Sequence, residues 1–475
     1  MKNIRRNLAS VWMIVLSFQN VMSQTVSVYQ TSSDGIQKLS QQNDRFFTET
    51  SCGGTIITID NGVKYQTMDG FGAAMTGSSA YLMNNQMNTL QRNALMDDLF
   101  GSSGIALSFV RHSIGSSDFS LSNYTYHEPG ETFSIADDTT DLIPMLLEAK
   151  NRNNDLKIMG TPWSAPAWMK TNASLFGGSL KDNHLDDFAL YLVRYINAFE
   201  EKGLPIYAIT MQNEPLNESS SYPSMKMEWF QQSNLLRFHL GPSLATEGLE
   251  TKVLLYDHNW DVTDYAKDIL SVAETEPYAA GTAFHGYAGD VSAQSEVYNH
   301  NTAKGIWFTE QSGGDWSPDF DENLDWYARN LIVGTIRNWS KSVLLWNLAL
   351  DNSNGPTNGG CSNCRGVVTI NDDGSYTKEI EYYILGHMSK FVFPGAYRIK
   401  SAIEEGIQNV AFENPDGSMV LIAYNTNELN KYVKFRIGEK EFKYTMPGGA
   451  LTTFKWDQVV ASRTVKNSGL MKAGN

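Results

Sequence analysis

Two glutamates in this sequence could act together as a catalytic pair. The stretch ITMQNEPLN ends an apolar run with Asn213 and Glu214, directly before Pro215. A second apolar run, GIWFTEQSG, carries Glu310 near its end. Asn, Glu and Pro are common where strands turn, so a turn explains either stretch taken alone. Two carboxylates that converge on one cleft can hydrolyse a glycosidic bond, because a protonated one assists the leaving group while an ionised one attacks.

The elements that must position these glutamates are strand-like runs that alternate with helical segments over residues 67–388. One segment, residues 185–202, repeats apolar side chains at helical spacing. Strands that alternate with helices pair in parallel, and eight such units predict a (β/α)8 TIM barrel, an α/β fold. The eight apolar runs are residues 68–74, 105–115, 156–166, 207–215, 252–260, 280–289, 305–313 and 342–351.

Each of these runs becomes polar or aromatic towards its carboxyl end. In a barrel those ends meet at one face, where active sites form. Glu214 closes the fourth run and Glu310 the seventh, so we expect them to face each other across the rim. The side chains at these strand ends are Arg111, Asp118, Trp163, Asn213, Glu214, Asp257, His258, His285, Tyr287, Glu310 and Trp346.

The two ends of the chain differ from the middle. Residues 24–66 and 389–460 show strand-like alternation between turn residues, and neither is long enough to close a β-sandwich alone. We therefore predict one β-sandwich domain built from both ends, followed by a tail at 461–475. Residues 1–23 combine a basic start, a short apolar stretch and small residues before Gln24, which is typical of a signal peptide. The apolar stretch is too short to span a membrane, so the sequence predicts export to the periplasm or the extracellular space.

The charge and aromatic content of the chain limit the kinds of molecule that it is expected to bind. The net charge is 37 − 52 = −15, which is unfavourable for nucleic acid or anionic membrane surfaces. Aromatic residues make up 12 % of the chain, which suits either a large core or flat surfaces for sugar rings. We expect a neutral polymer as partner, no membrane span and a monomeric protein.

Three cysteines complete the inventory of reactive groups. Cys361 and Cys364 have C-x-x-C spacing in GGCSNCRG, and in an exported protein this spacing favours a disulfide. A zinc site would need a second pair of ligands, and a redox role would need a thioredoxin-like context; neither is visible. Cys52 is left as a free thiol.

Seven motifs stand in order along the mature chain: TMDGFGAAMTGSSAYL, RHSIGSSDFS, TPWSAPAWMKTN, ITMQNEP, FTEQSGG, LLWNLALD and EYYILGHMSKFVFPGAYRI. In this order they resemble glycoside hydrolase family 30, which includes the lysosomal glucosylceramidase and microbial endo-β-1,6-glucanases. The resemblance implies retaining hydrolysis, with Glu214 as the acid/base and Glu310 as the nucleophile.

The resemblance also implies a set of substrate-binding side chains. Asn213 would hold the sugar 2-hydroxyl, and Arg111 and Tyr287 would contact the nucleophile. The full implied set is Asn213, Arg111, Trp163, His285, Tyr287 and Trp346. For His112 and His258 a purely structural role and a role in the site stay equally open.

One departure from the glucosylceramidase pattern bears on the substrate. Gly77 occupies the position where that branch carries an Asp that grips a terminal glucose. The loop DNSNGPTNGGCSNCRGVVTI resembles the endo-β-1,6-glucanase branch instead. We therefore predict an endo-acting enzyme that cleaves β-1,6-glucan. The alternatives within the family are a glucosylceramidase, an exo-β-glucosidase or a β-xylosidase.

Other classes are less compatible with the sequence. A carbohydrate-binding protein on an inactive enzyme scaffold would not need both glutamates with their supporting residues. A serine hydrolase would need a G-x-S-x-G elbow, and a metal hydrolase would need H-E-x-x-H or a comparable ligand cluster. The sequence therefore predicts no metal and no cofactor.

Overall fold

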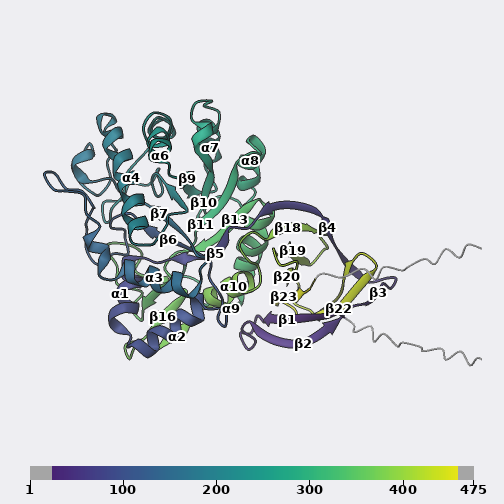
Figure 1. Cartoon of the computed structure of the whole chain (residues 1–475). Coiled ribbons are helices and arrows are strands. Elements are labelled where there is room, and N and C mark those ends of the chain that lie inside the picture. Colours follow the sequence, from purple (N-terminus) through teal and green to yellow (C-terminus); the bar gives the residue numbers. More distant parts are fainter. Residues whose placement is uncertain (1–23, 458–475) are drawn as a thin grey trace, which may run out of the picture.

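The computed structural model describes residues 24–457, and the predicted signal peptide and tail lie outside the described residues. Eight parallel strands close into a barrel in the order β10-β11-β13-β5-β6-β7-β8-β9 (Figure 1). The TIM barrel predicted from the sequence is therefore confirmed. Its strands are β5 (Gly70–Ala74), β6 (Phe109–Ser113), β7 (Lys157–Thr161), β8 (Ala208–Thr210), β9 (Lys252–Asn259), β10 (Ala279–His285), β11 (Gly305–Glu310) and β13 (Ser340–Leu345).

Helices surround the barrel and pack side chains against its strands. Along the predicted helical segment, Phe188, Leu192 and Phe199 are fully buried against the strands. The helix α2 (Thr89–Phe100) begins at a capping box. The Asn88 side chain accepts from the Gln91 backbone N–H, and the Gln91 side chain accepts from the Asn88 backbone N–H. The α-helices are α1 (Gly77–Tyr81), α2 (Thr89–Phe100), α3 (Leu142–Arg152), α4 (Leu185–Glu201), α5 (Trp229–Asn234), α6 (Gly241–Glu247), α7 (Thr263–Leu270), α8 (Ala293–His300), α9 (Phe320–Trp326) and α10 (Ile380–Ser389).

The second domain is a β-sandwich made from both chain ends, as predicted. Its 10-stranded sheet runs β2-β1-β23-β20-β19-β18-β4-β21-β22-β3, so amino-terminal and carboxyl-terminal strands interleave. The exact limits predicted for the domains stay predictions. The strands are β1 (Thr25–Thr31), β2 (Ser40–Phe46), β3 (Thr48–Glu49), β4 (Thr55–Thr67), β18 (Tyr397–Ser401), β19 (Ile407–Glu413), β20 (Met419–Asn425), β21 (Lys431–Ile437), β22 (Lys440–Met446) and β23 (Leu451–Trp456).

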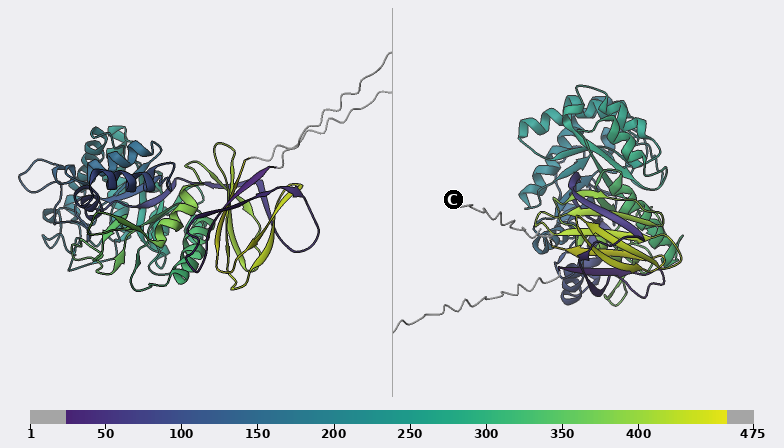
Figure 2. Two further views of the ribbon diagram at one scale, coloured as in Figure 1. Left: turned by 90° about the horizontal axis from the view of Figure 1, so that it is seen from below. Right: turned by 90° about the vertical axis from the view of Figure 1, so that its right-hand side faces the viewer.

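The sandwich packs beside the barrel next to α10 (Figure 2). Phe412, Val420 and Ile422 of its sheet belong to the same buried cluster as the barrel helices. At this junction His387 of α10 forms hydrogen bonds of 2.8 Å with Thr31 and with Thr453, one from each chain end. Burial lowers the pKa of His387 to about 3, so it is neutral and structural.

Short strands on the carboxyl side of the barrel organise its rim loops. β14 (Ala349–Asp351), β16 (Val368–Ile370) and β17 (Tyr376–Lys378) form a small sheet, and β12 (Gly313–Gly314) pairs with β15 (Cys364–Arg365). Within residues 24–457, none of the helices combines the length and the apolar character needed to cross a bilayer.

Candidate active site

The chain after β8 is bent so that it presents Asn213 and Glu214 on the rim. The predicted run continued to residue 215, but β8 ends at Thr210. The Asn213 N–H donates to the Pro162 carbonyl at 2.8 Å, and the Glu214 N–H donates to the Asp257 carbonyl at 3.0 Å. Glu214 adopts a left-handed backbone with φ 44°, which a non-glycine residue rarely adopts except at turns and functional sites. The neighbouring loops therefore fix the direction of its side chain.

The two glutamates face each other in one site. Carboxylate oxygens of Glu214 and Glu310 and a ring nitrogen of His285 all lie within 4.8 Å of one another. The two carboxyl groups are separated by about 5 Å in retaining glycosidases and by about 6.5–9.5 Å in inverting ones, where a water must fit between them. The spacing in this protein matches the retaining geometry.

Asp257, near the end of β9, accepts hydrogen bonds from four side chains of the site. One carboxylate oxygen accepts hydrogen bonds from Arg111 at 3.0 Å and Thr210 at 2.7 Å. The other accepts from His285 at 3.0 Å and Thr309 at 2.7 Å. Burial opposes the charge of Asp257, but Arg111 and His285 hold its pKa well below the usual range. Asp257 is therefore an ionised anchor for two cationic side chains.

Arg111, on β6, links the nucleophile candidate to the rest of the site. Its side chain is fully buried, and it donates to the Glu310 carboxylate and, at 2.7 Å, to the Asn213 side-chain oxygen. The guanidinium therefore places a fixed positive charge against the Glu310 carboxylate. The same contact fixes the Asn213 amide with its oxygen towards Arg111, which leaves the NH2 group available to a ligand.

His285 lies between the two glutamates. Its Nδ1 is 3.2 Å from Glu214 and 3.8 Å from Glu310. Burial opposes a charge on this ring, but Glu310 and Asp257 outweigh burial and raise the pKa of His285 to about 9. Burial also opposes a charge on Glu214, yet the hydrogen bond and the charge of His285 lower the pKa of Glu214 to about 2. The opposite shifts of the two pKa values have one cause, the hydrogen-bonded contact between His285 and Glu214.

The same three groups have the spacing of metal ligands. A histidine ligates a metal through a deprotonated nitrogen. Both nitrogens of His285 also face carboxylates, Nδ1 towards Glu214 and Nε2 towards Asp257.

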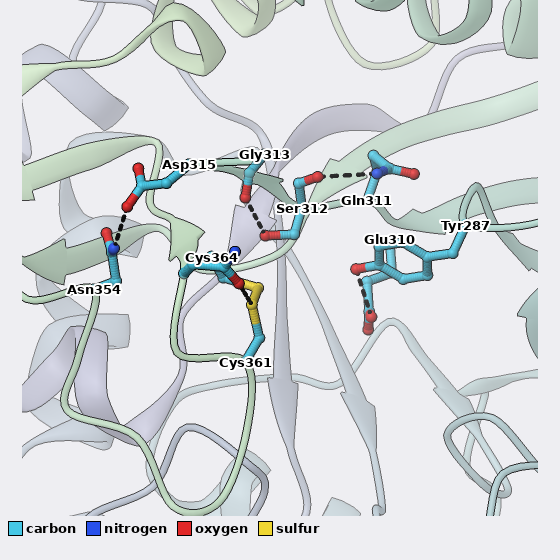
Figure 3. Close-up of a disulfide and its surroundings, with 10 residues drawn as sticks. Tyr287, Glu310, Gln311, Ser312, Gly313, Asp315, Asn354, Cys361 and Cys364 are labelled. Atoms are coloured by element: carbon cyan, nitrogen blue, oxygen red, sulfur yellow. Dashed lines mark hydrogen bonds between the residues drawn. A yellow bond between two sulfur atoms is a disulfide. The ribbon is translucent and has the colours of Figure 1, made fainter. Parts of the chain in front are cut away.

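Aromatic side chains wall the site on the opposite side. The rings of Trp163 and Trp346 stack with centroids 4.9 Å apart, and the Arg111 guanidinium lies 5.0 Å from the Trp163 ring. Tyr287 donates to Glu310 at 3.0 Å and is 42 % exposed (Figure 3). Burial of the hydroxyl and the charge of Glu310 raise the pKa of Tyr287 well above 10, so the hydroxyl stays a donor.

His112 and His258, whose roles the sequence left open, have different surroundings in the structure. His112 bonds Tyr195 at 2.7 Å and the Ser113 carbonyl at 3.0 Å and stacks on Phe199. Burial lowers its pKa to about 4, so it is a structural residue. His258 has Nε2 4.0 Å from Glu214, and its buried Nδ1 has no hydrogen-bond partner among residues 24–457. It belongs to the site.

Sequence reasoning gave no role to Asp257 or Asp118, although both stand in the strand-end pattern. Asp257 positions Arg111 and His285 through hydrogen bonds. These side chains come from separate strands, which only the strand order of the barrel brings together. Burial and then the charges of Glu310 and Glu214 raise the pKa of Asp118 well above its usual range. One oxygen of Asp118 is buried without a hydrogen-bond partner in the described part of the chain.

The barrel and its facing glutamates define a glycoside hydrolase. The chain belongs to glycosyl hydrolase family 30: the family's TIM-barrel domain matches residues 68–392, and its beta sandwich domain matches residues 395–454. The resemblance read from the seven motifs is thus confirmed, and with it the retaining mechanism general to the family.

Individual relatives are similar along most of the chain. An endo-1,6-beta-D-glucanase of Trichoderma harzianum is 34 % identical over 425 residues, which cover 82 % of this chain and 84 % of the relative. The lysosomal acid glucosylceramidase of Mus musculus is 28 % identical over 441 residues, which cover 85 % of this chain and 84 % of the relative. The solved structure of an endo-beta1,6-glucanase has a TM-score of 0.87 at 36 % identity and covers 91 % of this chain and 99 % of its own.

Proposed function

We propose that this protein is an endo-acting glucanase that cleaves β-1,6-linked glucan with retention of configuration. The observation that carries the proposal is the facing pair Glu214 and Glu310 within 4.8 Å, in a chain whose relatives at 34–36 % identity are endo-1,6-β-glucanases. Gly77 supports an endo mode, because no carboxylate at this position grips the end of a chain. We also propose that the protein is exported and acts as a monomer.

In the first step the ionised Glu310 attacks the anomeric carbon of the bound glucosyl unit. The bond to the leaving chain breaks as Glu214 donates a proton to the departing oxygen, which leaves a covalent glycosyl-enzyme. In the second step Glu214 takes a proton from a water, the water attacks the anomeric carbon, and Glu310 is released. The sum is hydrolysis of one bond by one water.

The low pKa of Glu214 in the free protein requires a source for that first proton. His285 can supply it, because its Nδ1–H points at Glu214 over 3.2 Å. Transfer leaves a neutral Glu214 acid and a neutral His285 that still donates from Nε2 to Asp257. Substrate that displaces water from the partly exposed Glu214 favours this transfer, because the carboxylate loses solvation that the neutral acid does not need.

The surrounding side chains stabilise the charges that change during the reaction. Arg111 and Tyr287 stabilise Glu310 before the attack and again when it leaves. The Asn213 amide reaches the 2-hydroxyl, a contact that strengthens as the oxocarbenium ion forms. Trp163 and Trp346 provide the apolar wall against which a sugar ring packs.

A linkage panel tests the proposal. The purified protein is incubated with β-1,3-, β-1,4- and β-1,6-glucans and with glucosylceramide, and early products are sized. We expect hydrolysis of β-1,6-glucan with mixed oligosaccharides appearing first. Early release of glucose alone would instead identify an exo-β-glucosidase, and hydrolysis of glucosylceramide without hydrolysis of glucan would identify a glucosylceramidase.

A further inference from the structure

An exposed tryptophan stands on the loop that follows Glu310 and has no role in the chemistry described so far. Trp316 is 53 % exposed, which makes it the most exposed tryptophan among residues 24–457. It follows Glu310 by six positions, in the loop that leaves the carboxyl end of β11. A single exposed apolar side chain is common on protein surfaces, but Trp316 is held in an unusual way.

The indole of Trp316 lies against a glycine. A Cβ built on Gly314 would lie 2.0 Å from Cζ3 and 2.4 Å from Cη2 of the ring. Only a residue without a side chain leaves room for the ring at this place. The six-membered ring is thus supported by backbone on one side, and no aromatic ring of residues 24–457 stacks on it. A flat, supported ring that is half exposed to solvent is the geometry that a sugar ring can stack on.

The support beneath Trp316 is rigid and is joined to the pocket wall. Gly314 pairs with Cys364, which forms a disulfide with Cys361, as the sequence predicted. The Asp315 N–H donates to the Asn363 carbonyl at 2.9 Å, and Asn354 donates to the Asp315 carboxylate at 2.7 Å. Figure 3 shows the chain leaving Glu310 and running beside this disulfide. The disulfide and the two hydrogen bonds of Asp315 hold the loop in one conformation. The Trp316 ring is therefore positioned before a ligand binds.

The disulfide also places this support next to the sugar-binding wall. Cys364 is buried in one apolar cluster with Trp163 and Trp346, and Cys361 packs against the same cluster. The Ser317 N–H donates to the Gly314 carbonyl at 3.1 Å, which closes a tight turn around Trp316. Two residues span at most about 7 Å of chain, so Trp316 stays within that reach of the strand pair that abuts the pocket wall.

We propose that Trp316 is a second sugar-binding platform of the cleft, which stacks on a glucosyl unit of the bound chain beyond the unit that reacts. The proposal rests on the glucanase function proposed above and deepens it. An endo enzyme must hold units on either side of the reacting one, and the stacked pair Trp163 and Trp346 is almost fully buried. Trp316 supplies affinity for the chain and takes no part in proton transfer or attack.

The test compares Trp316→Ala, Trp316→Phe and the control Trp326→Ala. Within residues 24–457 Trp326 is the other exposed tryptophan, 37 % exposed at the end of α9, and it lacks the glycine support. Rates are measured on β-1,6-glucan and on β-1,6-linked oligosaccharides of increasing length, and folding is checked by circular dichroism and thermal unfolding. For Trp316→Ala we expect kcat/KM on the polymer to fall roughly tenfold, mainly through KM, with little change on the disaccharide. Trp316→Phe should keep most of the activity because it keeps a flat ring.

If Trp316→Ala kept the wild-type kcat/KM on the polymer, the proposed platform would be wrong. An equal loss of kcat/KM on substrates of every chain length would also contradict it. A second readout does not depend on the variants. Bound β-1,6-glucan oligosaccharide should protect Trp316 of the wild-type protein from oxidation by N-bromosuccinimide, mapped by peptide mass spectrometry, while Trp326 is oxidised as before. Absence of protection at saturating ligand would contradict the proposal. If the wild-type protein failed to cleave β-1,6-glucan at all, the proposed function itself would be wrong, which is a distinguishable outcome.

Discussion

Replacing Glu310 with glutamine is expected to lower kcat on β-1,6-glucan by about four orders of magnitude or more. The amide has nearly the shape of the carboxylate but cannot attack the anomeric carbon or carry the covalent intermediate. Arg111 can still donate to the amide oxygen, and Asp257 still neutralises the guanidinium, so the site keeps its packing. The measurement is single-substrate kinetics on purified protein whose thermal unfolding matches the wild type.

The matched control for this variant is Glu322→Gln. Glu322 is exposed on α9 and lies twelve positions further along the same segment, so the same chemical change there should leave kcat unaltered. A folded Glu310→Gln protein that hydrolysed glucan at the wild-type rate would show that another residue is the nucleophile.

Replacing Glu214 with alanine should separate the two chemical steps. General acid catalysis typically contributes about 10²–10⁴-fold, so hydrolysis of glucan should fall by that factor. An activated aryl β-glucoside needs little help from an acid, so its first step should be spared. Azide should then restore turnover, because a small anion fits where the carboxylate was and needs no base. The product should be a β-glucosyl azide, identified by nuclear magnetic resonance.

Glu218→Ala is the control for the alanine variant, since Glu218 is exposed in the same loop. It should leave both substrates unaffected. An equal loss of activity on activated and unactivated substrates for Glu214→Ala, with no response to azide, would remove Glu214 from the acid/base role.

The sequence was informative where function lies at strand ends. Asn213, Glu214 and Glu310 each follow a recognisable apolar run, and counting runs placed the two glutamates on one rim. The interleaved sandwich was also predictable, because neither chain end could bury its apolar face alone. These features depend on local pattern and on how many strands there are.

Other features depend on which elements become neighbours. Asp257 became a central residue only because β9 lies between β8 and β10, which bring Thr210 and His285 to its two oxygens. His112 and His258 looked alike in sequence, and the packing of α4 against one of them decided the difference. The raised pKa of His285 follows from the carboxylates of Glu310 and Asp257 that surround it, and no spacing along the chain encodes that arrangement.

The most direct test of the central claim is covalent trapping of the glycosyl-enzyme. A 2-deoxy-2-fluoro glucoside with a good leaving group slows the second step more than the first, so the intermediate accumulates. Proteolysis and mass spectrometry then locate the sugar. We expect one adduct per chain, on Glu310, and no adduct in the Glu310→Gln variant. An adduct on any other residue, or inactivation without an adduct on the peptide that carries Glu310, would contradict it.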